Sequence, residues 1–164
     1  MNDEKVDDIS LEPEYVLPAE DTWDGVIYKI VYEYNKAPYR PGEAKGTGRI
    51  MFIQLEEGAG TVELDGVKSR LSVRAFDGKK TPFRDVAAMH KVDKASELIG
   101  KMIRVLVKHR PRKNGKGNYA LAESFLTPKT KGLELTNMDP ADVGCFKRDY
   151  DKQDDKDVDS NLPF

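Results

Sequence analysis

Cysteine, histidine and long apolar runs are scarce in this 164-residue chain, and each shortage excludes a class of protein. The only cysteine, Cys145, excludes an internal disulfide, and with only His90 and His109 beside it a zinc cluster of Cys and His ligands cannot form. No apolar run approaches the roughly 18 residues that cross a bilayer, and the first residues, MNDEKVDD, are acidic where a secretory signal would be basic. We therefore expect a cytoplasmic protein of a reducing compartment, with no cofactor, no metal and no membrane partner.

Motifs for catalysis are also lacking. The stretch GKKT at residues 78–81 suggests a phosphate-binding loop, but the Gly-Lys-Ser/Thr of such a loop and the glycine five positions before it are missing. Acids of the central part, such as Asp65, Asp77, Asp85 and Asp93, fall at predicted turns and at a helix start, where Asp is favoured for capping. The sequence predicts that the protein is not an enzyme, and a metal-dependent nuclease ranks last among the functions it allows.

Acidic and basic residues are unevenly distributed, although the formal net charge is only -2. Residues 1–24 hold nine acids and one lysine (net -8), and residues 25–148 hold 24 bases and 14 acids (net +10). Residues 149–164 hold six aspartates and two lysines (net -4). A basic body between two acidic ends is typical of a domain that binds a polyanion and whose ends shield it or recruit partners. The alternative is a basic surface that is merely solvated.

Alternating β-branched and aromatic residues dominate the central part of the chain and predict strands. Three strands are predicted in TWDGVIYKIVYEY, GRIMFIQLEE and SRLSVRAF, which are separated by segments that contain Gly and Pro. Residues 82–100 change to an apolar period of three to four residues, which predicts one helix with a break near residues 91–93. The stretches MIRVLVKHR and NYALAESFL predict two more strands.

The predicted order β-β-β-α-β-β is that of a five-stranded OB-fold Greek-key barrel with its helix between strands 3 and 4. The predicted fold class is therefore mainly β. We expect the OB-fold domain over residues 22–131, after a flexible acidic segment over residues 1–21. A connector follows over residues 132–148, with a short helix beginning at Asp139-Pro140. Residues 149–164 are expected to form a flexible acidic tail, because such a stretch buries too little apolar surface to offset the entropy of ordering it.

The last stretch of the sequence is DKQDDKDVDSNLPF, in which five aspartates precede an apolar Leu-Pro-Phe. The end DVDSNLPF resembles the tail of bacterial and phage single-stranded DNA-binding proteins, which finish in a run of Asp followed by a short apolar residue, Pro and Phe. In this chain Ser160 and Asn161 interrupt the Asp run. The resemblance covers about a tenth of the chain.

This resemblance implies a protein that coats single-stranded DNA with little sequence preference during DNA replication, recombination or repair. It also implies that the tail recruits a polymerase, helicase, primase or recombinase, with Phe164 in an apolar pocket and its carboxylate against an Arg or Lys of the partner. A phage-encoded member would act in the cytoplasm of its bacterial host, and a homo-oligomer is one option. The predicted partner-binding residues are Asp154, Asp155, Asp157, Asp159, Leu162, Pro163 and Phe164.

Single-stranded nucleic acid is bound by cationic grooves that follow the phosphates and by aromatic faces on which bases stack. The third predicted strand puts Arg70, Ser72, Arg74 and Phe76 on one face, opposite apolar residues. The loop HRPRKNGKGNY between strands 4 and 5 concentrates cations beside glycines, and in an OB fold this loop lines the ligand face. With the loops after strands 1 and 3, the predicted nucleic-acid-binding residues are Tyr39, Arg40, Lys45, Arg49, Arg70, Arg74, Phe76, Lys79, Lys80, Arg84, Lys108, Arg110, Arg112, Lys113, Lys116 and Tyr119.

Two questions stay open in the sequence. In strand 1, Tyr28, Tyr32 and Tyr34 share a parity, and the pattern does not decide whether they or Ile27 and Val31 face the interior. The second question is function, because a protein-binding or assembly module whose basic loops meet an acidic protein partner has the same charge pattern. The other large rings, Trp23, Phe52, Phe125 and Phe146, are expected to pack inside.

Overall fold

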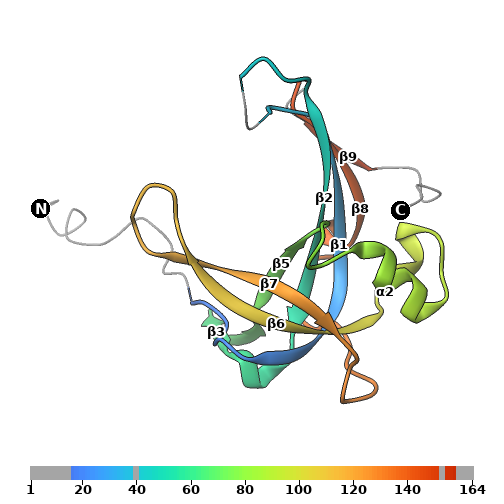
Figure 1. The fold of residues 1–164 in the computed structure, drawn as a ribbon. Coiled ribbons are helices and arrows are strands. Elements are labelled where there is room, and N and C mark those ends of the chain that lie inside the picture. The colour runs from blue at the N-terminus through green and yellow to red at the C-terminus, as the bar shows by residue number, and fades with distance from the viewer. Residues whose placement is uncertain (1–15, 39–40, 152–153, 158–164) are drawn as a thin grey trace, which may run out of the picture.

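A computed structural model describes residues 16–38, 41–151 and 154–157, and within these ranges the chain is mainly β (Figure 1). The strands are β1 (Thr22–Lys36), β2 (Gly46–Leu55), β3 (Thr61–Leu64), β4 (Val67–Arg70), β5 (Ser72–Phe76), β6 (Met102–Pro111), β7 (Asn118–Leu126), β8 (Gly144–Asp149) and β9 (Asp154–Asp157). The helical elements are the α-helix α2 (Phe83–His90) and the short 3-10 helices η1 (Glu57–Ala59), η2 (Ala95–Leu98) and η3 (Pro140–Asp142). No helix within the described ranges has the length and apolar character needed to span a membrane.

Five strands close into a ring because β1 pairs on both of its sides. The order around the ring is β1-β2-β5-β7-β6 and back to β1. β1 is antiparallel to β2 between Gly25 and Lys36 and antiparallel to β6 between Thr22 and Val26. β5 and β7 complete the ring through one parallel pair, Arg74 with Leu121. The prediction of a mainly β domain with one α-helix is therefore confirmed for the residues that the structure describes.

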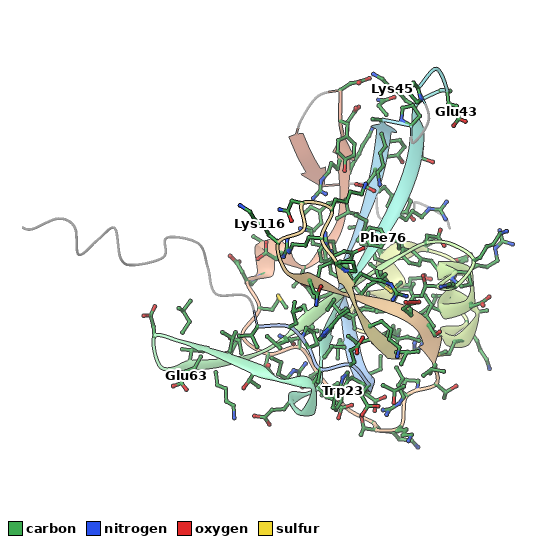
Figure 2. The ribbon with its side chains drawn as sticks, turned by 60° about the vertical axis from the view of Figure 1, so that its left-hand side comes forward. Trp23, Glu43, Lys45, Glu63, Phe76 and Lys116 are labelled. Carbon is green, nitrogen blue, oxygen red and sulfur yellow. The ribbon has the colours of Figure 1, made fainter. Side chains whose placement is uncertain are left out.

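The strands β3 and β4 were not predicted and form a separate two-stranded sheet between β2 and β5. At their turn, Asp65 and Gly66 have φ values of 52° and 79°, which a tight hairpin turn requires. The predicted third strand is divided, because Arg70 ends β4 and Ser72 begins β5. The α-helix therefore follows the fifth strand, and the prediction that it lies between strands 3 and 4 is wrong. Figure 2 shows the hairpin, which carries Glu63, extending away from the large sheet.

A β-bulge in β1 decides which of its side chains face the interior. The register with β2 shifts between Ile27 and Lys29, so Tyr28 has no partner in that pairing. Ile27 and Ile30 both lie in the core, and Tyr32 joins them, whereas Tyr28 lies outside the core cluster. Neither of the two orientations considered for strand 1 is correct along its whole length, because the bulge reverses the alternation midway.

The core fills the ring and is closed by the helical segment. α2 begins after Pro82 and ends at His90. The capping residue Lys91 has a left-handed φ of 56°, so the predicted break near residues 91–93 is confirmed. η2 follows this break. Phe83 and Leu98 are fully buried with the inward side chains of the ring strands, which are Met51, Ile53, Leu55, Val73, Ala75, Ile103, Val105 and Val107.

The segment predicted as a connector over residues 132–148 contains a strand, because β8 pairs in parallel with β1 from Lys29 to Tyr34. β9 then pairs antiparallel with β8. The short helix predicted at Asp139-Pro140 is present as η3, and the Asp139 side chain accepts a hydrogen bond of 2.9 Å from the Ala141 amide. This part of the chain therefore adds two strands to the open edge of β1.

A buried carboxylate fastens the chain after β7 to the body. Asp24 is completely buried and accepts hydrogen bonds from the Thr130 hydroxyl (2.7 Å), the Thr130 and Lys129 amides (2.8 and 3.1 Å) and Arg104 (3.1 Å). Burial by itself would raise the pKa of Asp24, but these hydrogen bonds outweigh it and hold the pKa below its ordinary value of 3.8. The carboxylate thus stays charged and links β1, β6 and the following segment.

Candidate functional site

Three of the predicted nucleic-acid-binding residues, Arg74, Arg112 and Tyr119, line a surface hollow beside β5. This hollow, called the central hollow here, has a volume of about 310 Å³. Its walls come from the segment before β1, the four strands β1, β2, β5 and β7, and the β6–β7 turn. The lining residues are Val16, Leu17, Pro18, Tyr28, Phe52, Ser72, Val73, Arg74, Arg112, Tyr119 and Ala120.

The alternation of β5 places the predicted polar row on the outside, as expected. Ser72, Arg74 and Phe76 are exposed, while the residues between them are buried. The bulge in β1 adds a ring to this face, because it brings Tyr28 beside Phe52, with the ring centroids 6.1 Å apart. Burial raises the pKa of Tyr28, although a hydrogen bond with Ser72 acts in the opposite direction, so the Tyr28 hydroxyl stays neutral at physiological pH.

Two cations, Arg74 of β5 and Lys29 beside the bulge in β1, lie over aromatic rings. The Arg74 guanidinium is 5.8 Å from the centre of the Phe76 ring, and Lys29 Nζ lies 5.2 Å from Phe52 and 5.1 Å from Phe146. Such pairs hold the long cationic side chains against flat rings. The positive charges are therefore placed next to surfaces on which a flat apolar group could stack.

A second hollow, of about 290 Å³, continues from the exposed end of β5 towards β7. Its walls include Phe76, Lys79, Lys80 and Arg110. Glu123 projects into this group, where it forms an ion pair of 3.3 Å with Lys80 and contacts Arg110. The local net positive charge is consequently lower than the count of predicted cations suggests.

The two loops that were expected to flank the site approach each other. A hollow of about 630 Å³ is lined by Lys36, Glu43 and Thr47 on the β1–β2 side and by Lys113 of the β6–β7 turn. The predicted cation Lys45 is exposed near this hollow and forms an ion pair of 2.7 Å with Asp151. Figure 2 places Glu43 and Lys45 at one end of the molecule and Trp23 at the opposite end.

Some predicted cations have structural partners or lie apart from the central hollow. Arg70 donates a 2.7 Å hydrogen bond to Gln54, and desolvation lowers its pKa. Arg49 forms a 2.9 Å ion pair with Asp77. Arg84 is exposed on α2. Lys108 lines a further hollow, which shares Lys80, Arg110 and Glu123 with the second one. Lys116 lies exposed in the β6–β7 turn, at the hairpin end labelled in Figure 2.

Other predicted site residues lie outside the ranges that the structure describes. These are Tyr39 and Arg40 in the β1–β2 loop and Asp159, Leu162, Pro163 and Phe164 in the tail. Asp154, Asp155 and Asp157 belong to β9, which pairs with β8.

Sequence reasoning missed Tyr28 and Phe52 as part of the site, along with the wall made by residues 16–18. Phe52 was expected to pack inside, but it lies on the outer face of β2 opposite the buried Met51 and Ile53. Its parity in the strand was the signal that could have placed it, because alternate residues of a strand face opposite sides. No comparable signal marks Tyr28, since a bulge is not visible in the apolar pattern.

Potential metal ligands and the single thiol, that of Cys145, are both present in the described ranges. Within them, no group of three or more His, Cys, Asp or Glu side chains is arranged to hold a metal ion. Cys145 is half-buried, and desolvation raises the pKa of its thiol to about 11, which keeps it protonated.

No family model, curated protein or solved structure matches this chain. A functional assignment therefore rests on the geometry of the described residues.

Proposed function

We propose that this chain binds and protects single-stranded DNA with little sequence preference during DNA replication, recombination or repair, in a bacterial or phage setting. The tail, ending in Leu162, Pro163 and Phe164, recruits a replication or repair protein such as a polymerase, helicase, primase or recombinase. Resemblance of that tail to those of single-stranded DNA-binding proteins, given above, supports this second part.

The observation that carries the proposal is the composition of the central hollow. Arg74 and Arg112 line it together with Tyr28, Phe52 and Tyr119, from four strands and a turn that are far apart in the sequence. Guanidinium groups suit phosphates, and ring faces suit unpaired bases, each stacked base contributing roughly 1–3 kcal/mol. Bases in a duplex are already stacked on each other, so this combination favours a single strand.

The order of strands around the ring supports assignment to the OB type. β1, β2 and β5 are joined antiparallel, and β5 meets β7 in parallel before β6 returns to β1. A Greek-key path of this kind is expected for a five-stranded OB barrel, whose ligand face lies between the β1–β2 loop and the β6–β7 turn. The central hollow lies on that side, next to Arg112 and Lys113.

Self-shielding by the acidic tail is part of the proposal. The ion pair between Lys45 and Asp151 brings the start of the tail to a cation of the β1–β2 loop. The pair is exposed on both sides and therefore weak, worth about 0–1 kcal/mol. A tether gives a local concentration of the order of millimolar, so even weak contacts are populated until DNA of micromolar affinity displaces them.

Fluorescence anisotropy with a labelled oligonucleotide, compared with a duplex of equal length, tests the proposal. We expect tighter binding to the single strand, and a slope of log affinity against log salt near -3.5 if about five phosphates are neutralised at roughly -0.7 each. Equal affinity for the duplex would contradict the proposal. Binding to neither nucleic acid would favour the alternative, a protein-binding module with an acidic protein partner. Loss of the oligonucleotide on addition of magnesium would instead indicate a nuclease.

A further inference from the structure

The acidic N-terminal stretch enters the structure at the central hollow. Val16, Leu17 and Pro18 line that hollow together with Tyr28, Phe52 and Arg74 of the body. The chain thus does not approach β1 along the far side of the molecule. It crosses the proposed DNA-binding face before β1 begins.

A set of backbone hydrogen bonds fixes this crossing. The Pro18 carbonyl bonds His109 Nε2 at 2.7 Å, and the Ala19 amide donates to the Ala59 carbonyl at 3.1 Å. The Ala19 carbonyl accepts from the Trp23 indole at 2.8 Å, and the Glu20 carboxylate accepts from the His109 amide at 2.8 Å. The anchor, residues 18–20, therefore holds the chain against β6 and η1, so the position of Val16, the first described residue, at the hollow is fixed.

The net charge of residues 1–15 is opposite in sign to the charge of the cations around the central hollow. Residues 1–15 contain six acids and one lysine, a net charge of -5. Arg74 and Arg112 line the central hollow, Lys113 follows at the turn, and Lys79 and Lys80 line the adjoining hollow. Fifteen residues can span at most about 50 Å, more than the roughly 35 Å diameter expected of a domain of this size, so the stretch can reach every one of these cations.

We infer that residues 1–15 dock in the central hollow and compete there with single-stranded DNA. The anchor keeps the acids at an effective concentration of the order of millimolar, so contacts with millimolar dissociation constants are about half formed. A DNA strand must displace them, which lowers its apparent affinity about two- to fivefold at low salt, and screening removes the effect at high salt. The competition rests on the proposed function, whereas the docking of the stretch does not.

The first experiment examines docking without nucleic acid. A nitroxide is attached at Ser10→Cys in the full chain carrying Cys145→Ala, and amide NMR intensities are compared with those of the diamagnetic form. At low salt we expect strong broadening at Ser72, Arg74 and Tyr119, with recovery at high salt, and little change in η2, which Figure 1 shows on the opposite side of the ring from the β6–β7 turn. Broadening at these residues no greater than in η2 would overturn the inference.

The second experiment measures competition by anisotropy with a labelled oligonucleotide. One variant neutralises the six acids of residues 1–15 to Asn or Gln. A control variant makes the same change in net charge at acids away from the hollow: Glu63, Asp65, Asp85, Asp93, Glu97 and Glu134. We expect the affinity for the oligonucleotide to rise two- to fivefold at low salt in the first variant and to stay unchanged in the control variant. Equal gains in both would overturn the competition, and absence of DNA binding in every variant, with broadening intact, would remove the proposed function while leaving docking in place.

Discussion

Replacing Phe76 by alanine should weaken single-strand binding without changing its salt dependence. The Phe76 side chain is 38% exposed on the outer face of β5, and its ring lies 5.8 Å from the Arg74 guanidinium. Loss of one stacked base removes about 1–3 kcal/mol, or roughly 5- to 150-fold in the dissociation constant. Because the ring carries no charge, the slope of log affinity against log salt should stay at its parent value.

The complementary variant is Arg112→Gln with Lys113→Gln, which removes two positive charges beside the central hollow and leaves the rings in place. If each cation neutralises one phosphate, the slope should become shallower by about 1.4, since each phosphate contributes roughly 0.7. Anisotropy titrations at several salt concentrations separate the two effects. Two matched controls are available: Met89→Ala on α2, which is also 38% exposed, and Lys101→Gln with Lys131→Gln, both exposed away from the hollow.

The refuting results are specific. If Phe76→Ala and Met89→Ala bind equally well, the ring of Phe76 does not stack on a base. If the Arg112 and Lys113 variant shows the same slope as the Lys101 and Lys131 control, the cations beside the hollow do not contact phosphates. The first result would remove base stacking from the interface and leave the phosphate contacts, and the second would do the reverse. Both together would contradict the proposed interface.

The remaining predictions concern the frame around the interface. Asp24→Asn should lower the free energy of unfolding by about 3 kcal/mol, because Arg104 loses its buried partner; chemical denaturation measures this. Because the folded pKa of Asp24 is below 3.8, its stabilisation is present above about pH 4 and is lost as pH falls further. The variant should therefore lose less free energy of unfolding between about pH 5 and pH 2 than the parent. An equal loss in both proteins over this range would refute the prediction. Gly25→Ala should lower Tm, with a cost of about 2 kcal/mol, since its Cβ would lie 2.5 Å from Ile53 Cγ2; an unchanged Tm would show that the sheet adapts. Removing residues 152–164 should raise oligonucleotide affinity a few fold at low salt, and unchanged affinity would remove self-shielding. Removing 149–164 should also lower Tm, because Asp149 accepts a 2.9 Å hydrogen bond from Asn35.

Much of the strand content follows from side-chain alternation, and β5 illustrates why. Apolar and polar residues alternate in SVRAF, and a strand with one face in the core must turn every second residue outward. The alternation alone therefore predicts that Arg74 and Phe76 share an exposed face. The helix break was equally local, because Lys91 follows the last apolar period of α2 and adopts a left-handed conformation there.

The β3–β4 hairpin shows where the pattern is insufficient. Asp65-Gly66 was recognised as a turn, but the short flanking stretches hold apolar residues that the structure leaves exposed, including Leu64 at 73%. Alternation of apolar and polar residues is required only where one face of a strand is buried in the core. A strand outside the main core need not show it, so the pattern does not predict such a strand. The division of the third predicted strand, and the misplaced helix, follow from this omission.

The sequence by itself determined the charge partition, the alternation of the ring strands and the cationic turn between β6 and β7, because each depends on residues that are neighbours in the chain. Only the tertiary structure decided which rings meet which cations. The bulge at Tyr28, the closure of the ring and the crossing of residues 16–18 bring together groups up to about a hundred positions apart, and such meetings depend on the register between strands. A one-residue change of register would turn the same side chains to the opposite face, which is why no local pattern could place them.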